Sequence, residues 1–237
     1  MVNFPTTLII GLGGVGSEIT AEVYRKFMKT YPSDIERRNI ICLCLDTDSG
    51  DIAKRKKILP ESWVVKTSSD LNSTVGDYVD SIQANTTVLD WFDTSSPYVM
   101  DMSLNEGAGQ IRMCSRLAIM AAMGEQKLNA INNAISSLLT QEPERHAGND
   151  IKVHIICSLA GGTGAGSFLQ IAYYVKDVMR NNFHVNSPKI TGYFVLADVL
   201  CNDRALGFNE KQKENTRSNT YACLKELDAF LHHDKVQ

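Results

Sequence analysis

The sequence lacks a Cys-x-x-Cys pair, although it contains six cysteines, at positions 42, 44, 114, 157, 201 and 223. Cysteines paired at that spacing are typical of zinc ribbons and of thioredoxin-like redox sites, so the sequence argues against both. Cys42, Cys44 and Cys157 instead lie inside apolar runs that are typical of strands. We therefore expect reduced, buried thiols.

An excess of positive charge is also missing. Lys and Arg total 24 and Asp and Glu total 27, which gives a formal net charge of -3. This balance argues against a general nucleic-acid-binding protein, and the basic cluster at 54–57 is interpreted as a solvated loop or helix end. The apolar runs are too short to cross a membrane, and no basic segment precedes the first of them. We expect a cytoplasmic protein with no direct nucleic-acid partner and no membrane partner.

Internal repeats, low-complexity tracts and a convincing linker are absent as well. Hydrophobic residues make up 43% and charged residues 22% of the 237 positions, which is ordinary for a globular protein. This length suits a single domain over residues 1–237. No Ser-His-Asp or Cys-His arrangement points to an activated nucleophile, so the sequence argues against covalent catalysis.

What the sequence does contain is a long glycine loop, Ala160-Gly161-Gly162-Thr163-Gly164-Ala165-Gly166-Ser167 (160–167). It follows a predicted strand at 151–159 and precedes a predicted helix at 168–180. A strand, a glycine loop and a helix in this order turn backbone N–H groups towards an anion. Glycine leaves room for phosphate oxygens to approach the backbone, and Thr163 and Ser167 add hydroxyl donors. The loop therefore predicts a phosphate site.

A first glycine loop, Gly11-Leu12-Gly13-Gly14-Val15-Gly16 (11–16), has the same setting. It lies between a predicted strand at 7–10 and a predicted helix at 17–31. Asp46 and Asp48 follow the next predicted strand, at 40–45. A glycine loop after one strand and acidic residues after the next are typical of a doubly wound sheet. Two such loops indicate a nucleotide held from two sides.

The rest of the chain continues the alternation of strands and helices. Helices are predicted at 112–139 and 210–232 and a strand at 190–196, while 60–105 is interpreted as loops with a strand and one or two helices. The sequence thus predicts a three-layer α/β fold: a mostly parallel, Rossmann-like sheet with helices on both faces.

Two enzyme classes share the pattern of the first glycine loop. Gly-x-Gly-x-x-Gly is typical of NAD-binding Rossmann domains, but Asp46 lies 30 residues beyond Gly16, where an acidic residue is expected after about 20. The loop also resembles the ATP loop of ubiquitin-activating-like adenylating enzymes, which usually carry an acidic pair like Asp46-Thr47-Asp48. Their characteristic arginine and Cys-x-x-Cys pairs are absent here. Neither class explains the long glycine loop, and both remain as alternatives.

The ordered set of motifs resembles the tubulin/FtsZ superfamily of GTPases and looks most like its divergent bacterial tubulin-like members. The set comprises the first glycine loop, Asp46-Thr47-Asp48, Gly107-Ala108-Gly109 (the Gly-Ala-Gly loop) and the long glycine loop. The resemblance covers nearly the whole chain, as the N-terminal GTP-binding domain. It implies GTP or GDP with Mg²⁺, and self-association of the full-length protein into filaments that hydrolyse GTP across a subunit contact.

The resemblance also implies where the nucleotide binds. The two glycine loops would grip the phosphates, the Gly-Ala-Gly loop would face the γ-phosphate, and the loop after the second strand would lie near the ribose and the metal, with Asp48 as metal ligand. The candidate binding residues are Gly11, Leu12, Gly13, Gly14, Val15, Gly16, Asp46, Asp48, Gly107, Ala108, Gly109, Gly161, Gly162, Thr163, Gly164, Ala165, Gly166, Ser167, Arg217 and Asn219.

Some positions depart from the family pattern. Ala160 stands where the family usually has its first glycine, and Ala165 where it usually has Ser or Thr; we expect Ser167 to substitute for that hydroxyl. Arg112 and Arg116 open a predicted helix and could reach a phosphate, although surface positions are favoured. Glu106 could orient a metal-bound water.

The chain ends at Gln237, where the family continues with a strand, a central helix, a catalytic loop and a second domain. We expect a fragment of a longer protein that binds nucleotide but by itself shows almost no GTP turnover and forms no filaments. A binding module that uses the nucleotide only as a structural ligand remains a third interpretation.

Overall fold

Five parallel strands form the central sheet in a computed structural model that describes residues 5–31, 33, 39–68, 73–82, 91–103, 107–140, 151–185, 187–203 and 206–233. The strands are β1 (Thr7–Leu12), β2 (Ile40–Asp46), β3 (Val64–Lys66), β4 (Lys152–Ser158) and β5 (Lys189–Val195). Their order is β3-β2-β1-β4-β5, and every neighbouring pair is parallel. Because the winding direction reverses between β1 and β4, a ligand crevice is expected at their carboxyl ends.

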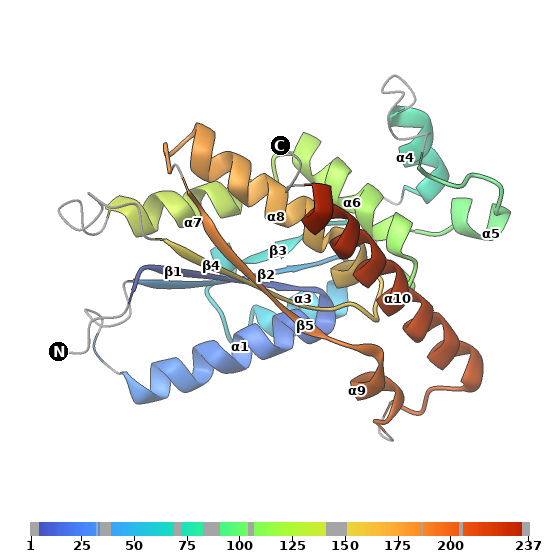
Figure 1. The fold of residues 1–237 in the computed structure, drawn as a ribbon, viewed down its shortest axis with the longest axis horizontal. Helices are drawn as coiled ribbons and strands as arrows, with labels where there is room; N and C mark the ends of the chain where they lie inside the picture. The colour runs from blue at the N-terminus through green and yellow to red at the C-terminus, as the bar shows by residue number, and fades with distance from the viewer. Residues whose placement is uncertain are drawn as a thin grey trace.

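Helices cover both faces of this sheet (Figure 1). α1 (Gly13–Thr30) and α3 (Ser49–Arg55) pack on one face, and α7 (Asn129–Thr140) and α8 (Thr163–Asn181) pack on the other. Two more helices, α6 (Arg112–Gly124) and α10 (Glu210–His233), lie against α8. The shorter described helices are η1 (Glu61–Trp63), α4 (Val75–Ile82), α5 (Pro97–Met100) and α9 (Ala197–Cys201). None of the described helices is both long and apolar enough to span a membrane. The predicted three-layer α/β class is confirmed.

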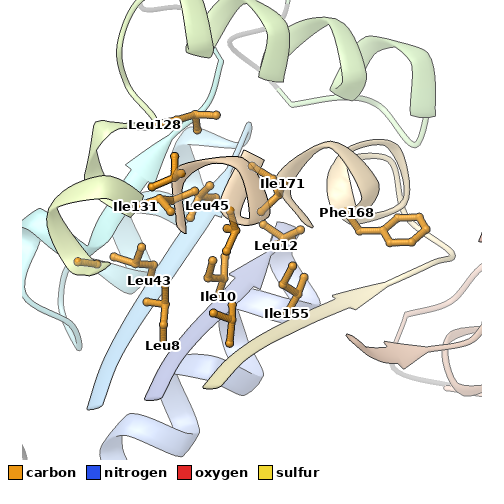
Figure 2. Close-up of a cluster of buried hydrophobic side chains, with 14 of the residues drawn as sticks. Leu8, Ile10, Leu12, Leu43, Leu45, Leu128, Ile131, Ile155, Phe168 and Ile171 are labelled. Atoms are coloured by element: carbon orange, nitrogen blue, oxygen red, sulfur yellow. The ribbon is translucent and has the colours of Figure 1, made fainter. Parts of the chain in front are cut away.

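The core follows from the alternation of side chains along the central strands. Leu8, Ile10 and Leu12 of β1 point to the face covered by α7 and α8, where they meet Ile131 and Ile171 (Figure 2). On β2, Leu43 and Leu45 share that face, whereas Cys42 and Cys44 belong to the smaller cluster under α1 and α3. Strands buried on both faces read as continuous apolar runs, which is why the sequence pattern located them.

All six cysteines are free and buried, as predicted. Burial raises the pKa of Cys42 and of Cys44 to about 12, so both side chains stay thiols at neutral pH.

The predicted helix at 112–139 is wrong as one element. The structure divides it into α6 and α7, because Gln126 adopts a left-handed backbone with φ of 58° just after Gly124. The helices predicted at 17–31 and 168–180 exist but begin earlier, at Gly13 and Thr163. The second half of each glycine loop is therefore the first turn of a helix.

Candidate functional site

Two helices begin at the same edge of the sheet without a side-chain cap. β1 ends at Leu12 and α1 starts at Gly13, whose φ of +70° makes the turn within a single residue. α8 starts at Thr163, after Gly162. Neither Leu12 nor Gly162 supplies a capping side chain, so the first-turn N–H groups and the positive ends of both helix dipoles remain available.

These two helix starts border one cavity of about 350 Å³. They lie close together, because a Cβ built on Gly13 would stand 3.1 Å from the backbone nitrogen of Gly164. We call this space the glycine-lined cavity. Its described lining residues are Leu12, Gly13, Gly14, Val15, Asp46, Thr47, Asp48, Asp51, Gly107, Ala108, Gly109, Gln110, Ser158, Gly161, Gly162, Thr163, Gly164 and Leu200.

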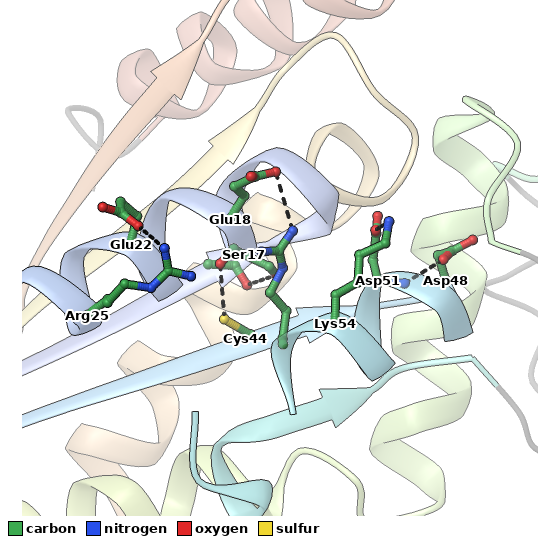
Figure 3. Close-up of polar contacts among 10 residues, drawn as sticks. Ser17, Glu18, Glu22, Arg25, Cys44, Asp48, Asp51 and Lys54 are labelled. Carbon is green, nitrogen blue, oxygen red and sulfur yellow. Dashed lines mark hydrogen bonds and ion pairs between the residues drawn. The ribbon is translucent and has the colours of Figure 1, made fainter. Parts of the chain in front are cut away.

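One wall of the cavity is acidic. The Asp46 side chain is buried, with 2% of the residue exposed. Its Oδ1 accepts hydrogen bonds from the N–H groups of Thr47 (2.7 Å) and Asp48 (3.2 Å). Its Oδ2 has no partner among the described residues. Burial raises the pKa of the Asp46 carboxyl to about 6, although those two N–H groups lower it in part. Asp48 caps α3 by accepting from the N–H of Asp51 (2.8 Å), and Asp51 pairs with Lys54 (Figure 3).

The Gly-Ala-Gly loop lies beside this acidic wall, because a Cβ on Gly107 would stand 3.6 Å from Oδ2 of Asp48. Gly107 and Gly109 have φ of 96° and 54°, and Gln110, which has a side chain, also adopts a left-handed backbone with φ of 63°. The loop touches the long glycine loop, because a Cβ on Gly162 would lie 3.0 Å from the Cβ of Ala108. A hydrogen bond between the hydroxyls of Thr47 and Thr163 (2.8 Å) links the acidic wall to α8.

The structure brings most of the predicted binding residues together around this cavity. Those lining it are Leu12, Gly13, Gly14, Val15, Asp46, Asp48, Gly107, Ala108, Gly109, Gly161, Gly162, Thr163 and Gly164. Gly11, Gly16, Ala165, Gly166, Ser167, Arg217 and Asn219 are not among its lining residues. Glu106 lies outside the described residues.

Several of these outlying residues have structural contacts instead. The Ser167 hydroxyl donates to the carbonyl of Thr163 one turn back (2.6 Å), so it does not replace the missing hydroxyl in the cavity wall. A Cβ on Gly16 would overlap the carbonyl of Ile156, and one on Gly166 would overlap that of Arg112. These glycines let α1 approach β4 and let α8 approach α6. Arg217 is exposed on α10.

The basic residues weighed from the sequence also lie elsewhere. Arg112 donates to the carbonyl of Ala165 (3.3 Å) and pairs with Glu226, and Arg116 stacks over Trp91 at 4.3 Å. The basic cluster at 54–57 is expected to be solvated. This expectation is wrong for Arg55, which is 7% exposed and pairs with Glu18 (3.3 Å).

Sequence reasoning did not select five residues that line the cavity: Thr47, Asp51, Gln110, Ser158 and Leu200. Asp51 could have been found, because it stands three residues after a helix-capping aspartate and thus in the first turn of the following helix. Leu200 could not, since it comes from α9, which no pattern in the sequence predicted.

The strand order and the position of the cavity define a doubly wound, Rossmann-like α/β domain with a cavity at its switch point. Within this class the chain belongs to the tubulin-like family: the family model described as "Tubulin like" matches residues 8–237.

Two solved structures from Haloferax volcanii are similar. CetZ1, a GDP-bound monomer, is 14% identical with a TM-score of 0.45, and the alignment covers 81% of this chain and 41% of that one. CetZ2, a GTPγS-bound protofilament, is 13% identical with a TM-score of 0.41, and the alignment covers 81% of this chain and 40% of that one. The chain thus spans less than half the length of either. It matches no curated protein sequence.

Proposed function

We propose that the chain is the guanine-nucleotide-binding domain of a tubulin-like GTPase and that the glycine-lined cavity holds the phosphates. The family match supports this function. The observation that carries it is the convergence of two uncapped helix starts, those of α1 and α8, on one cavity. Phosphate oxygens are acceptors that such N–H groups and helix dipoles favour.

The backbone of Gly13, Gly14 and 161–164 would contact the phosphates, and the Gly-Ala-Gly loop would face the γ-phosphate. Gly161 fits this role well, because a Cβ built on it meets nothing within 4 Å and would project into open space. The fit depends on uncharged donors, since no Lys or Arg is among the described residues that line the cavity.

This charge pattern supports a requirement for Mg²⁺. A polyphosphate in the cavity would face the carboxylates of Asp46, Asp48 and Asp51. Lys54 pairs with Asp51, but no Lys or Arg among the described residues that line the cavity offsets Asp46 and Asp48. The described residues contain no group of three ligating side chains around one metal position. That suits Mg²⁺, which usually takes one or two carboxylates together with phosphate oxygens and waters. Asp48 is the residue we propose to hold it, and the bound ion would neutralise phosphate charge.

GTP hydrolysis and self-association form the wider part of the proposal. Membership of the tubulin-like family supports both, and phosphoryl transfer in this family depends on positioning and electrostatic stabilisation. An NAD-binding or adenylating function is the alternative, because Asp46 ends β2 where those enzymes bind ribose.

Titration calorimetry with GTP, GDP, ATP and NAD in the presence of Mg²⁺ separates these functions. We expect GTP and GDP to bind with micromolar affinity or weaker, about -8 kcal/mol or less favourable. ATP and NAD should bind more weakly than either. Tighter binding of ATP or NAD than of GTP would overturn the proposal and favour the alternative.

A further inference from the structure

Asn219 of α10 lies behind the two loops that border the glycine-lined cavity. Its Nδ2 donates to the backbone carbonyls of Gln110 (3.0 Å), Ala160 (3.2 Å) and Gly161 (3.3 Å). Two N–H hydrogens are thus shared among three acceptors. The side chain does not line the cavity; it lines a separate groove of about 970 Å³ between α6, α8 and α10, and Gln110 borders both spaces.

These hydrogen bonds from Asn219 also determine the direction of two backbone N–H groups on the cavity side, because the peptide unit is rigid. In a planar trans peptide, the carbonyl of one residue and the N–H of the next point in opposite directions. The carbonyls of Ala160 and Gly161 point to Asn219. The N–H groups of Gly161 and Gly162 therefore point away from α10, and both residues line the cavity.

The third acceptor belongs to a strained turn. Gln110 holds φ of 63°, a left-handed conformation that costs a residue with a side chain about 1 kcal/mol or more. The N–H of Ile111 donates to the carbonyl of Ala108 (2.7 Å), which closes the turn from inside. Asn219 holds the Gln110 carbonyl from outside, so its amide fixes the Gly-Ala-Gly loop and the long glycine loop at once.

The contact face of α10 combines hydrogen bonds with apolar packing: Cys223 belongs to the main core cluster, Leu227 packs against that cluster, and Phe230 contacts Tyr173 of α8. The buried residues of α10 are Thr216, Thr220 and Cys223, and the Cys223 thiol donates to the carbonyl of Ala165 (3.3 Å). Removing the Asn219 amide would leave three backbone carbonyls without this donor.

We propose that Asn219 is a positioning residue for the phosphate site: it orients the N–H groups of Gly161 and Gly162 and holds the Gly-Ala-Gly loop beside them. This role rests on the proposed function. It deepens that function, because Asn219 should matter more for binding GTP than for binding GDP. GTP engages both loops that Asn219 holds, whereas GDP has no phosphate to face the Gly-Ala-Gly loop.

The test compares GTP and GDP affinities of the wild-type chain with those of Asn219→Ala and Asn219→Asp. Aspartate keeps the volume of asparagine but donates no hydrogen bond. We expect GTP affinity to fall about tenfold or more and GDP affinity about threefold, the range for losing one or two hydrogen bonds. Asn215→Ala, one turn earlier on α10, is the matched control and should change neither affinity. Circular dichroism and thermal melting accompany each titration.

Three results would overturn the role of Asn219 while leaving the proposed function standing. The first two are unchanged nucleotide affinities in Asn219→Ala and Asn219→Asp, and equal losses of affinity for GTP and GDP. The third is unfolding of both variants, which would show that Asn219 is needed for folding only. If the wild-type chain binds neither GTP nor GDP, the proposed function fails and the role of Asn219 fails with it.

Discussion

At the scale of single residues, Gly161 and Gly164 belong to the same loop but meet different surroundings. A Cβ on Gly161 meets nothing within 4 Å, whereas one on Gly164 would lie 2.8 Å from the Cβ of Cys157 and 3.0 Å from the carbonyl oxygen of Ser158. Gly161 is thus free to accept a side chain, and Gly164 is needed for packing α8 on β4.

Replacing Gly161 with valine should therefore abolish GTP binding without unfolding the protein. The side chain would occupy the cavity, while stability should change by less than about 0.5 kcal/mol, as for an ordinary surface position. Gly164→Val should instead lower the free energy of unfolding by about 1–3 kcal/mol or more through overpacking. Fluorescence titration and urea unfolding measure both quantities. Full GTP affinity in a folded Gly161→Val variant would contradict the phosphate site.

Asp46 makes stability depend on pH. Burial raises the pKa of its carboxyl in the folded chain to about 6 from 3.8, so the fold favours the protonated form. Its stabilising contribution is fully present below about pH 4 and is lost as the pH rises through about 6. Asp46→Asn removes this titration while an amide oxygen can still accept the bonds from Thr47 and Asp48.

In metal-free buffer, wild-type stability relative to Asp46→Asn should fall by roughly 2–3 kcal/mol between pH 4 and pH 7.5, since one pKa unit corresponds to about 1.4 kcal/mol. Urea unfolding at a series of pH values measures the difference. A constant difference across this range would show that the folded carboxyl titrates normally.

At the scale of elements, the strands were predicted better than the helix starts. β1, β2, β4 and β5 begin and end within two residues of the predicted positions, because buried parallel strands leave continuous apolar runs. α1 and α8 begin four and five residues before their predicted starts, within glycine-rich sequence. Glycine has low helix propensity, and no capping side chain marks either start, so pattern alone could not locate them.

The close packing of α1 on β4 gives a prediction at this scale. A Cβ on Gly16 would overlap the Ile156 carbonyl, whereas one on Gly124, at the end of α6, meets nothing within 4 Å. Gly16→Ala should destabilise the protein by about 1–3 kcal/mol or more, because the helix must move away from the sheet. Gly124→Ala, the matched control, should be neutral or stabilise by up to about 1 kcal/mol. Thermal or urea unfolding compares the two, and equal effects would argue against this packing role.

At the scale of the whole molecule, the candidate site combines segments that are far apart in the sequence. The sequence motifs predicted which loops form the candidate site. Each glycine loop follows a strand, and the carboxyl ends of parallel strands lie at one edge of the sheet. Motifs did not separate residues that line the cavity from those that hold its walls. Gly16, Ser167 and Asn219 contact backbone behind those walls, and only the tertiary packing of α1, α8 and α10 shows it.

Because the cavity joins the ends of β1, β2 and β4 and the loop before α6, a bound nucleotide should stabilise the whole domain. At a GTP concentration about one hundred times the dissociation constant, linkage gives about 2.7 kcal/mol. For a domain of this size, that raises the melting temperature by roughly 5–10 °C.

EDTA should abolish the rise, because the acidic wall would then repel the phosphates without Mg²⁺ to offset the charge. Gly161→Val, whose side chain would project into the open space beside this lining residue, should show no rise with or without Mg²⁺. A thermal-shift series with GTP, Mg²⁺ and EDTA decides the matter: an equal rise in EDTA, or an equal rise in Gly161→Val, would mean that the nucleotide binds outside the glycine-lined cavity.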